Sequence, residues 1–302
     1  MPSTHNQLAS FKSGFVAIAG APNVGKSTLL NQILGEKLAI TSKKPQTTRN
    51  RILGILHRPA AQLIFIDTPG IHEATKPLNI RIVDAALSAL GDVDIVLIVV
   101  DVASRDSNAE EFLVKKLKSV KQPVVLALNK IDLIKKPLLL KLIDTWSKAH
   151  PFEAIMPVSA ILGDQVEELV AAMESLLPKG PSLFPADTIT DMTENFIVAE
   201  MIREKVFRLT GQEIPYSTAV SVDSLSESEK GARVTIHATI HVERASQKGM
   251  VIGKNGSRLK MIGTEARKEI ERMMGSNVFL KLFVRVQKNW SKDTRALRRF
   301  GY

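Results

Sequence analysis

The sequence of 302 residues has no cysteine, few aromatic residues and no long hydrophobic run. The absence of cysteine excludes disulfide bonds and metal sites built on thiolates. The longest aliphatic run, Ile95 to Val100, is far too short to cross a bilayer, and it is typical of a buried parallel strand. Residues 1–13 lack the apolar centre of a secretory signal and are predicted to be a flexible extension.

The chain also has fewer acidic than basic residues, with 31 Asp and Glu and 41 Lys and Arg. Residues 1–244 hold 27 residues of each sign, whereas residues 245–302 hold 14 basic and 4 acidic residues. The whole net charge of +10 therefore lies at the carboxyl end of the chain. A neutral body with a basic end indicates a polyanionic partner for that end.

The length of the chain predicts two domains. In residues 14–178, short apolar strands alternate with amphipathic helices, which predicts an α/β domain with a mostly parallel sheet. Residues 179–190 contain two prolines and a glycine and follow directly on Pro178. They are predicted to be a stiff linker that lets the domains reorient. Residues 191–287 read as a helix, two strands, a helix pair and a strand, which predicts an α+β domain. Residues 288–302 form a basic tail.

The strongest motif lies between an apolar strand and an apolar helix start near the beginning of the chain. It consists of Gly20, Ala21, Pro22, Asn23, Val24, Gly25, Lys26, Ser27 and Thr28. The glycines let backbone N–H groups point at phosphate oxygens, Lys26 brings a charge to the β- and γ-phosphates, and Ser27 offers a hydroxyl to Mg²⁺. The flanking strand and helix favour this phosphate-binding loop over a simple glycine-rich turn.

A second motif follows a predicted strand and comprises Asp67, Thr68, Pro69, Gly70 and Ile71. The Asp67 carboxylate can hold Mg²⁺ through water, and the Gly70 N–H can bond a γ-phosphate and lose it on hydrolysis. Thr47 and Thr48, in the basic loop 39–50, are candidates to close over the metal and the γ-phosphate. Thr48 is favoured, and a solvated pair of threonines is the alternative.

A third motif, comprising Asn129, Lys130, Ile131 and Asp132, is expected to select the base of the bound nucleotide. The Asp132 carboxylate can accept hydrogen bonds from both N1–H and the 2-amino group of guanine, whereas adenine offers neither donor. Asn129 is expected to reach the other edge of the purine, and the Lys130 stem to cover the ring. Ser159 and Ala160 are expected to offer a backbone N–H to guanine O6. The pattern indicates GTP rather than ATP.

The basic end of the chain contains a glycine loop before an amphipathic helix: Val251, Ile252, Gly253, Lys254, Asn255 and Gly256, followed by Arg258 and Lys260. Such a loop clamps the backbone of single-stranded RNA, and the two apolar residues are expected to floor a groove for bases. In the tail, Trp290 is expected to stack on a base and Arg295 and Arg298 to contact phosphate. A solvated basic helix is the alternative for the tail.

In order, the motifs read GAPNVGKS, PQTTRNR, DTPGIH, NKID, VSA and VIGKNG. They resemble those of the Era family of GTPases over nearly the whole chain. The resemblance implies a Ras-like P-loop GTPase domain followed by a type II KH domain. It also implies hydrolysis of GTP to GDP, and binding of the 3′ end of 16S ribosomal RNA during assembly of the small (30S) subunit. A cytoplasmic protein, loosely associated with the inner membrane, is implied; a monomer and no DNA partner are expected.

Ile71 stands where signalling GTPases place a water-orienting glutamine, which predicts slow hydrolysis. Asn23 resembles the K⁺-binding asparagine of potassium-stimulated relatives, and loop geometry is an equal alternative. The predicted catalytic residues are thus Lys26, Thr48, Gly70 and Asn23, and the Mg²⁺ ligands are Ser27, Thr48 and Asp67. The rival functions are an RNA-binding assembly factor whose nucleotide site does not turn over and a membrane-surface GTPase.

Overall fold

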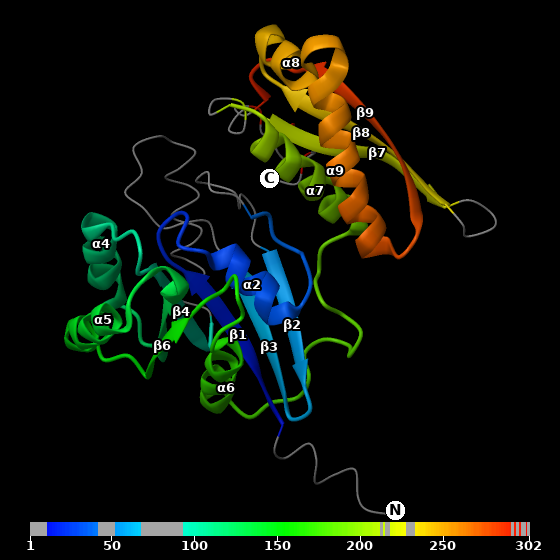
Figure 1. The fold of residues 1–302 in the computed structure, drawn as a ribbon. Coiled ribbons are helices and arrows are strands. Elements are labelled where there is room, and N and C mark those ends of the chain that lie inside the picture. The colour runs from blue at the N-terminus through cyan, green and yellow to red at the C-terminus, as the bar shows by residue number, and fades with distance from the viewer. Residues whose placement is uncertain are drawn as a thin grey trace, which may run out of the picture. The chain divides into compact units, whose positions relative to one another are not determined.

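A computed structural model describes residues 11–41, 52–67, 93–211, 214, 218–227, 233–290, 293, 296 and 300 (Figure 1). The chain divides into two compact units, Met1–Asp191 and Met192–Tyr302, and each is described by itself. Within the described ranges, no helix is both long enough and apolar enough to span a membrane.

The first unit is built on a six-stranded sheet with the order β2-β3-β1-β4-β5-β6. The strands are β1 (Lys12–Ala19), β2 (Ile52–Arg58), β3 (Ala61–Asp67), β4 (Ile95–Asp101), β5 (Val124–Asn129) and β6 (Ala154–Val158). Neighbouring strands are parallel except β2, which runs antiparallel to β3. The central strands are buried on both faces, which explains why they read as continuous apolar runs.

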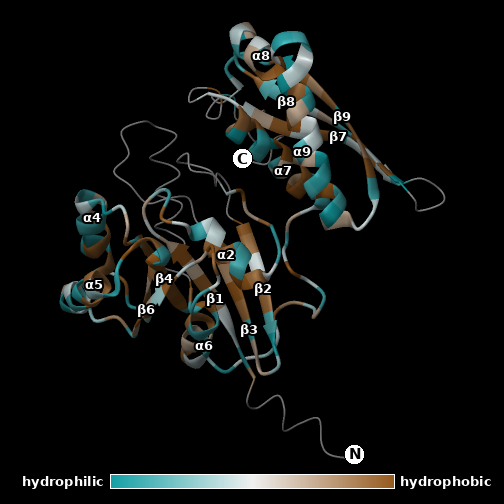
Figure 2. Cartoon of the chain, in the orientation of Figure 1, coloured by the Kyte–Doolittle hydropathy of each residue, from teal (hydrophilic) through white to brown (hydrophobic). Residues whose placement is uncertain are grey.

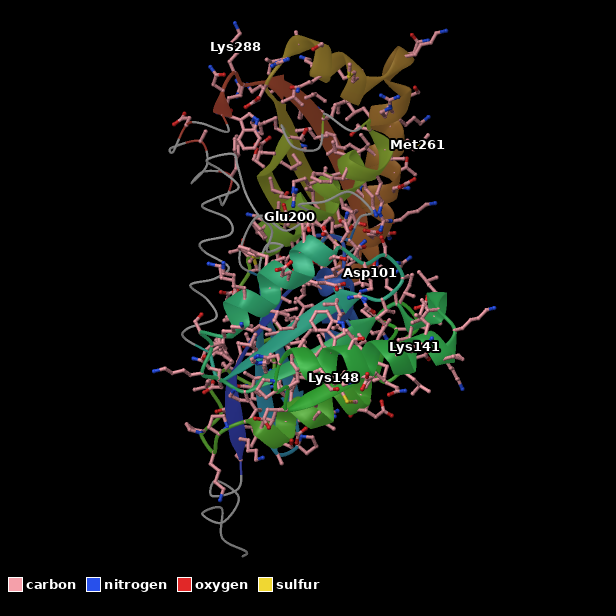
Figure 3. All side chains as sticks on the ribbon, turned by 90° about the vertical axis from the view of Figure 1, so that its left-hand side faces the viewer. Asp101, Lys141, Lys148, Glu200, Met261 and Lys288 are labelled. Atoms are coloured by element: carbon pink, nitrogen blue, oxygen red, sulfur yellow. The ribbon has the colours of Figure 1, made fainter. Side chains whose placement is uncertain are left out.

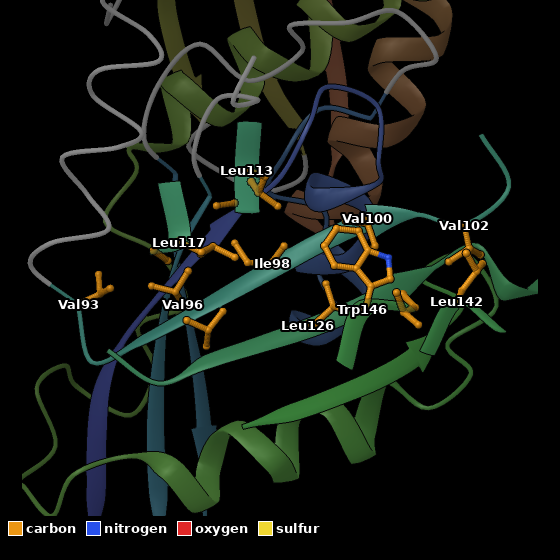
Figure 4. Packing of buried hydrophobic residues seen from close by; sticks show 14 of the residues in the cluster. Val93, Val96, Ile98, Val100, Val102, Leu113, Leu117, Leu126, Leu142 and Trp146 are labelled. Atoms are coloured by element: carbon orange, nitrogen blue, oxygen red, sulfur yellow. The ribbon is translucent and has the colours of Figure 1, made fainter. Parts of the chain in front are cut away.

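Helices cover this sheet and fix the ends of its strands. They are α2 (Lys26–Leu34), α4 (Ser107–Leu117), the 3₁₀ turn η1 (Ile131–Leu133), α5 (Lys136–Ala149) and α6 (Val166–Leu176). Figure 4 shows Trp146 of α5 beside Val100 and Leu126 in a buried hydrophobic cluster. The helix α2 ends at Leu34 because Gly35 takes the left-handed conformation that terminates helices.

Residues 179–190, expected to be a linker, are tied to the first unit over most of their length. The fully buried Gln62 amide donates to Phe184 O at 2.8 Å and accepts from Leu183 N at 2.7 Å. Further along, Ile55 N donates to Ile189 O at 2.9 Å. The free connection between the units is therefore shorter than the proline-rich sequence suggests.

The second unit contains α7 (Glu194–Leu209), β7 (Thr218–Glu227), β8 (Arg233–Val242), α8 (Ala245–Ile252), η3 (Lys254–Gly256), α9 (Ser257–Met274) and β9 (Asn277–Val286). Its sheet has the order β7-β8-β9, with β7 antiparallel and β9 parallel to β8. The helices α7 and α9 lie on the same side of this sheet (Figure 1). In Figure 2 the strands of the first sheet are mostly hydrophobic, whereas α9 carries hydrophilic residues on the side in view. The predicted fold class, with its change from α/β to α+β, is confirmed.

Candidate functional site

The predicted phosphate-binding loop connects β1 to α2 at the carboxyl end of β1. Gly20 cannot carry a side chain, because a Cβ there would lie 2.2 Å from the carbonyl oxygen of Val99. Gly25 has a φ of 101°, and a Cβ there would lie 2.3 Å from the side-chain nitrogen of Asn129. Both glycines are thus required by space, and α2 begins directly after them, so its N-terminus faces the loop.

The charged and hydroxyl groups of this loop are buried. Lys26 Nζ donates to Gly20 O at 3.0 Å and to Ala21 O at 2.9 Å. Burial lowers the pKa of Lys26 from 10.5 to about 8, and the nearby Asp67 carboxylate opposes that fall. Ser27 Oγ donates to Asp67 Oδ2 at 2.8 Å. A hydroxyl and a carboxylate side by side form the kind of oxygen donor set that Mg²⁺ prefers, so the residues present fit this ion.

Asn129 joins three loops at the end of β5. Its Nδ2 donates to Val24 O in the phosphate loop at 2.8 Å. Its Oδ1 accepts from Ala160 N at 2.9 Å and from Lys130 N at 2.8 Å. Asn129 Nδ2 carries a second N–H besides the one that Val24 O accepts, so the contact of Asn129 with the purine stays a prediction. Asn129 acts here as the tie that holds the nucleotide loops together.

Asp132 and Ser159 form the second tie. Ser159 Oγ donates to Asp132 Oδ1 at 2.6 Å, which orients an otherwise exposed carboxylate. The backbone N–H groups expected to reach guanine O6 are engaged, since Ser159 N donates to Asp164 O at 3.1 Å and Ala160 N to Asn129. The Ser159 hydroxyl thus contacts Asp132, which the short motif did not suggest, and the contact of this segment with guanine O6 stays a prediction.

Asp101 is a functional candidate that sequence reasoning missed (Figure 3). Its carboxylate forms an ion pair with Lys130 Nζ, and Lys130 Nζ also donates to Asn23 O in the phosphate loop at 2.9 Å. Asp101 Oδ1 further accepts from Ala103 N at 2.9 Å. Its position in the sequence could have identified it, because Asp101 is the last residue of an apolar strand, and parallel sheets bind ligands at the carboxyl ends of their strands.

Several predicted site residues lie outside the described residues: Thr48, Thr68, Pro69, Gly70, Ile71, Arg295 and Arg298. Asn23 is described and has a φ of 65°, a left-handed conformation that asparagine tolerates better than most residues. This observation supports the loop-geometry alternative for Asn23, and its K⁺ role stays a prediction. Pro22 and Thr28 lie within the loop and the first turn of α2, as the motif requires.

The glycine loop of the second unit turns sharply between α8 and α9. Gly253 has a φ of 73°, and a Cβ there would lie 2.8 Å from the Cβ of Arg258. Gly256, with a φ of 75°, precedes α9 directly. Between them Lys254 and Asn255 are exposed, as is Lys260 on α9. The Arg258 guanidinium donates to the carbonyl of Met250 at the end of α8, so it braces the turn.

Two predictions for this unit are wrong. Val251 has no exposed surface and belongs to the core, whereas Ile252 is only half-buried. Trp290 is 2% exposed and packs edge-on against Phe300, so its indole is unavailable for stacking on a base. The physical reason is the same for both, because burying an apolar side chain in the domain core is favourable, whereas leaving it exposed to water until RNA binds is not.

The geometry defines a class, a P-loop nucleotide-binding domain joined to a KH-type domain. A family model described as "50S ribosome-binding GTPase" matches residues 15–130, and one described as "KH domain" matches residues 213–291. GTPase Era of Geotalea uraniireducens (strain Rf4) is 55% identical over 292 residues, 97% of this chain and 98% of that protein. GTPase Era of Geobacter sp. (strain M21) is 57% identical over 293 residues, with the same two coverages. The chain therefore belongs to the Era family of GTPases.

Solved structures show the same likeness. One is Era in complex with MgGDPNP and nucleotides 1506–1542 of 16S ribosomal RNA, with a TM-score of 0.91 and 41% identity. Another is a variant of Aquifex aeolicus Era bound to GDP and AlF₄⁻, with a TM-score of 0.90 and 40% identity. Each comparison covers 97% of this chain and 99% of the other. The likeness therefore extends over both units.

Proposed function

We propose that this GTPase is a switch whose nucleotide state sets the affinity of its KH unit for the 3′ region of 16S ribosomal RNA during small-subunit assembly. The observation that carries the proposal is the Asn129 tie, which joins the phosphate loop to both base-binding loops. The same chain presents an exposed, cationic glycine loop. The solved relative with MgGDPNP and 16S nucleotides supports this choice of ligands.

The first unit has groups that would bind GTP and Mg²⁺. Lys26 already lies against two carbonyl oxygens of its own loop, which places its ammonium where phosphate oxygens would enter. Ser27 and Asp67 would hold Mg²⁺, which neutralises phosphate charge when it is bound. Asp132, oriented by Ser159, would accept both donors of the guanine edge. Slow hydrolysis, expected because Ile71 stands where signalling GTPases have a glutamine, stays a prediction.

The second unit supplies a backbone clamp. The two left-handed glycines leave room for a phosphate backbone, and Lys254 adds a positive charge at the turn. A clamp of this kind holds about four nucleotides and is selective for single-stranded RNA. The small ribosomal subunit is the proposed partner in the cytoplasm. Peripheral association with the inner membrane stays a prediction from the family resemblance.

The proposal is tested by RNA affinity in two nucleotide states. The full chain with Mg²⁺ is loaded with a non-hydrolysable GTP analogue or with GDP, and titrated with RNA of nucleotides 1506–1542 and with small subunits. A difference of severalfold between the states is expected, because the switch must change at least one partner's affinity. Equal affinities for both partners would refute the coupling.

A single-turnover GTPase assay addresses the rival in which the nucleotide is only structural. Excess protein is mixed with labelled GTP, and phosphate release is followed over time. Slow but complete conversion to GDP is expected. Retention of intact GTP, together with normal RNA binding, would favour the rival.

A further inference from the structure

The outer face of the second sheet carries two exposed aromatic rings. Phe279 and Phe283 of β9 are 43% and 47% exposed. The alternate residues of the strand face the helices, as shown by Leu282, whose Cδ1 would lie 3.5 Å from a Cβ on Gly263 of α9. Since the side chains of a strand alternate between its faces, both rings lie on the face turned away from the helices.

Cations surround these rings. The Arg233 guanidinium carbon of β8 lies 4.9 Å from the centroid of Phe279, and Lys281 Nζ lies 5.2 Å from the centroid of Phe283. Arg285, two residues further along β9, is exposed on the same face. We call these five residues, Arg233, Phe279, Lys281, Phe283 and Arg285, the β9 strip. The strip carries three positive charges, against which one carboxylate, that of Asp223, lies on the same face, bonded to Thr239, the partner of Phe283 in β8. The net positive charge favours a polyanion.

The neighbouring end of the same face shows that the chain can cover such a surface. There Trp290, Ala296 and Phe300 pack on Ala219 of β7, and the Phe300 ring lies 4.5 Å from the ring of His241. Although these residues bury that end, Phe279 and Phe283 remain exposed. Two exposed phenylalanines with cations over their rings are more than the scattered apolar residues of an ordinary surface.

The β9 strip lies next to the glycine loop through a shared strand. Both α8 and α9, which flank Gly253–Gly256, contact β9. In the order β7-β8-β9, β9 is the outer strand of the sheet as the described residues define it. A chain held by the glycine loop on one side of β9 can therefore cross the free edge of this strand and reach the strip.

We propose that the β9 strip is a second contact for single-stranded RNA. Bases beyond those held by the glycine loop stack on Phe279 and Phe283, while Arg233, Lys281 and Arg285 contact phosphates. Aromatic rings accept the face of any base, and cations beside them accept the backbone, so the arrangement suits a single strand of any sequence. The inference rests on the proposed RNA-binding function and adds a site to it.

The test compares RNAs of two lengths on the full chain. The short RNA, of about four nucleotides, fills only the glycine loop; the long RNA is nucleotides 1506–1542. The double variant Phe279→Ala/Phe283→Ala should bind the long RNA roughly tenfold more weakly for each ring lost. Its affinity for the short RNA should stay within about twofold of the wild type, which also shows that the unit remains folded.

Substitutions that separate stacking from apolar contact sharpen the test. Phe279→Tyr/Phe283→Tyr should keep the wild-type affinity for the long RNA, because the rings remain. Phe279→Leu/Phe283→Leu should be as weak as the alanine pair, because leucine keeps apolar area but cannot stack. Leu140→Ala is the matched control, since Leu140 is 69% exposed on α5 of the first unit and should have no effect.

Charge reversal tests the cations independently. For Lys281→Glu/Arg285→Glu, the slope of log affinity against log salt concentration for the long RNA should become less steep, by the amount that the loss of about two phosphate contacts gives. The slope for the short RNA should not change. If the alanine pair binds both RNAs as the wild type does, the inference is wrong, and a simultaneous loss of small-subunit binding would assign the strip to a protein partner. If the wild type itself binds neither RNA, the proposed function fails instead.

Discussion

The nucleotide site and the glycine loop of the second unit differ in where their functional groups point. In the first unit, Lys26, Ser27, Asn129 and Asp132 all bond to other parts of the protein. In the second unit, Lys254 and Asn255 are exposed, and the loop depends on two left-handed glycines. In the nucleotide site, the loss of one side chain should disturb several loops, because its hydrogen bonds hold them together. In the glycine loop, RNA affinity should depend chiefly on the shape of the backbone and on its charge.

The largest expected effect concerns Asp132 in the nucleotide site. Asp132→Asn removes the acceptor for both guanine donors and places an amide donor against them, so GTP and GDP affinity should fall by about 100-fold or more. Xanthosine nucleotides, which carry a carbonyl at that edge, should bind the variant better than guanosine nucleotides do. Titration of a fluorescent nucleotide measures both. If the variant kept its preference for guanosine, the base assignment would be wrong.

The matching test of the backbone-shaped site is Gly253→Asp. A side chain at this position is strained by the positive φ and crowds Arg258, and a carboxylate repels phosphate, so RNA affinity should fall by about 100-fold or more. GDP affinity should not change. Gly249→Ala is the control, because Gly249 lies on α8 with open space around its Cα. Equal effects of the two changes on RNA binding would mean that shape is not what the loop provides.

The first site could be predicted in outline because its motifs constrain the backbone. Gly20 and Gly25 are required by close approach, and the strand and helix around them fix what the loop faces. The ties within it could not be predicted, since Asp101 and Lys130 are 29 residues apart and meet only through the register of β4 and β5. A motif records which residue is needed, but not which neighbour engages it.

The second unit was predicted well at the level of elements and poorly for its apolar side chains. The predicted order of a helix, two strands, a helix pair and a strand is present, and Thr193 caps the first helix with its Oγ1 accepting from Phe196 N at 3.3 Å. Yet Val251 and Trp290 are buried, whereas Phe279 and Phe283 are exposed. All four are apolar residues in a basic segment, so only tertiary packing decides which of them can meet RNA.

A third test uses the buried Lys26, whose pKa is lowered to about 8. Nucleotide phosphates favour the charged ammonium, so above pH 8 binding must take up a proton and affinity should fall. The fall approaches about tenfold per pH unit, while below pH 8 affinity should be nearly constant. Titration with GDP between pH 6.5 and about pH 9 measures it. The control is Lys26→Arg, whose guanidinium stays charged and should give a flat profile at weaker affinity. A parallel fall in both proteins would trace the effect to another group.

The smallest expected effect tests the tie that sequence reasoning missed. Asp101→Asn keeps the side-chain oxygen that caps Ala103 N but removes the charge that holds Lys130, and Lys130 in turn holds the phosphate loop at Asn23 O. Because Lys130 is partly exposed, the loss is modest, and GDP should dissociate about three- to tenfold faster. Asp144→Asn is the matched control, since Asp144 pairs with Lys148 on the exposed side of α5 and should change nothing. Equal dissociation rates for both variants and the wild type would show that the ion pair stabilises the edge of the sheet without positioning the nucleotide loops.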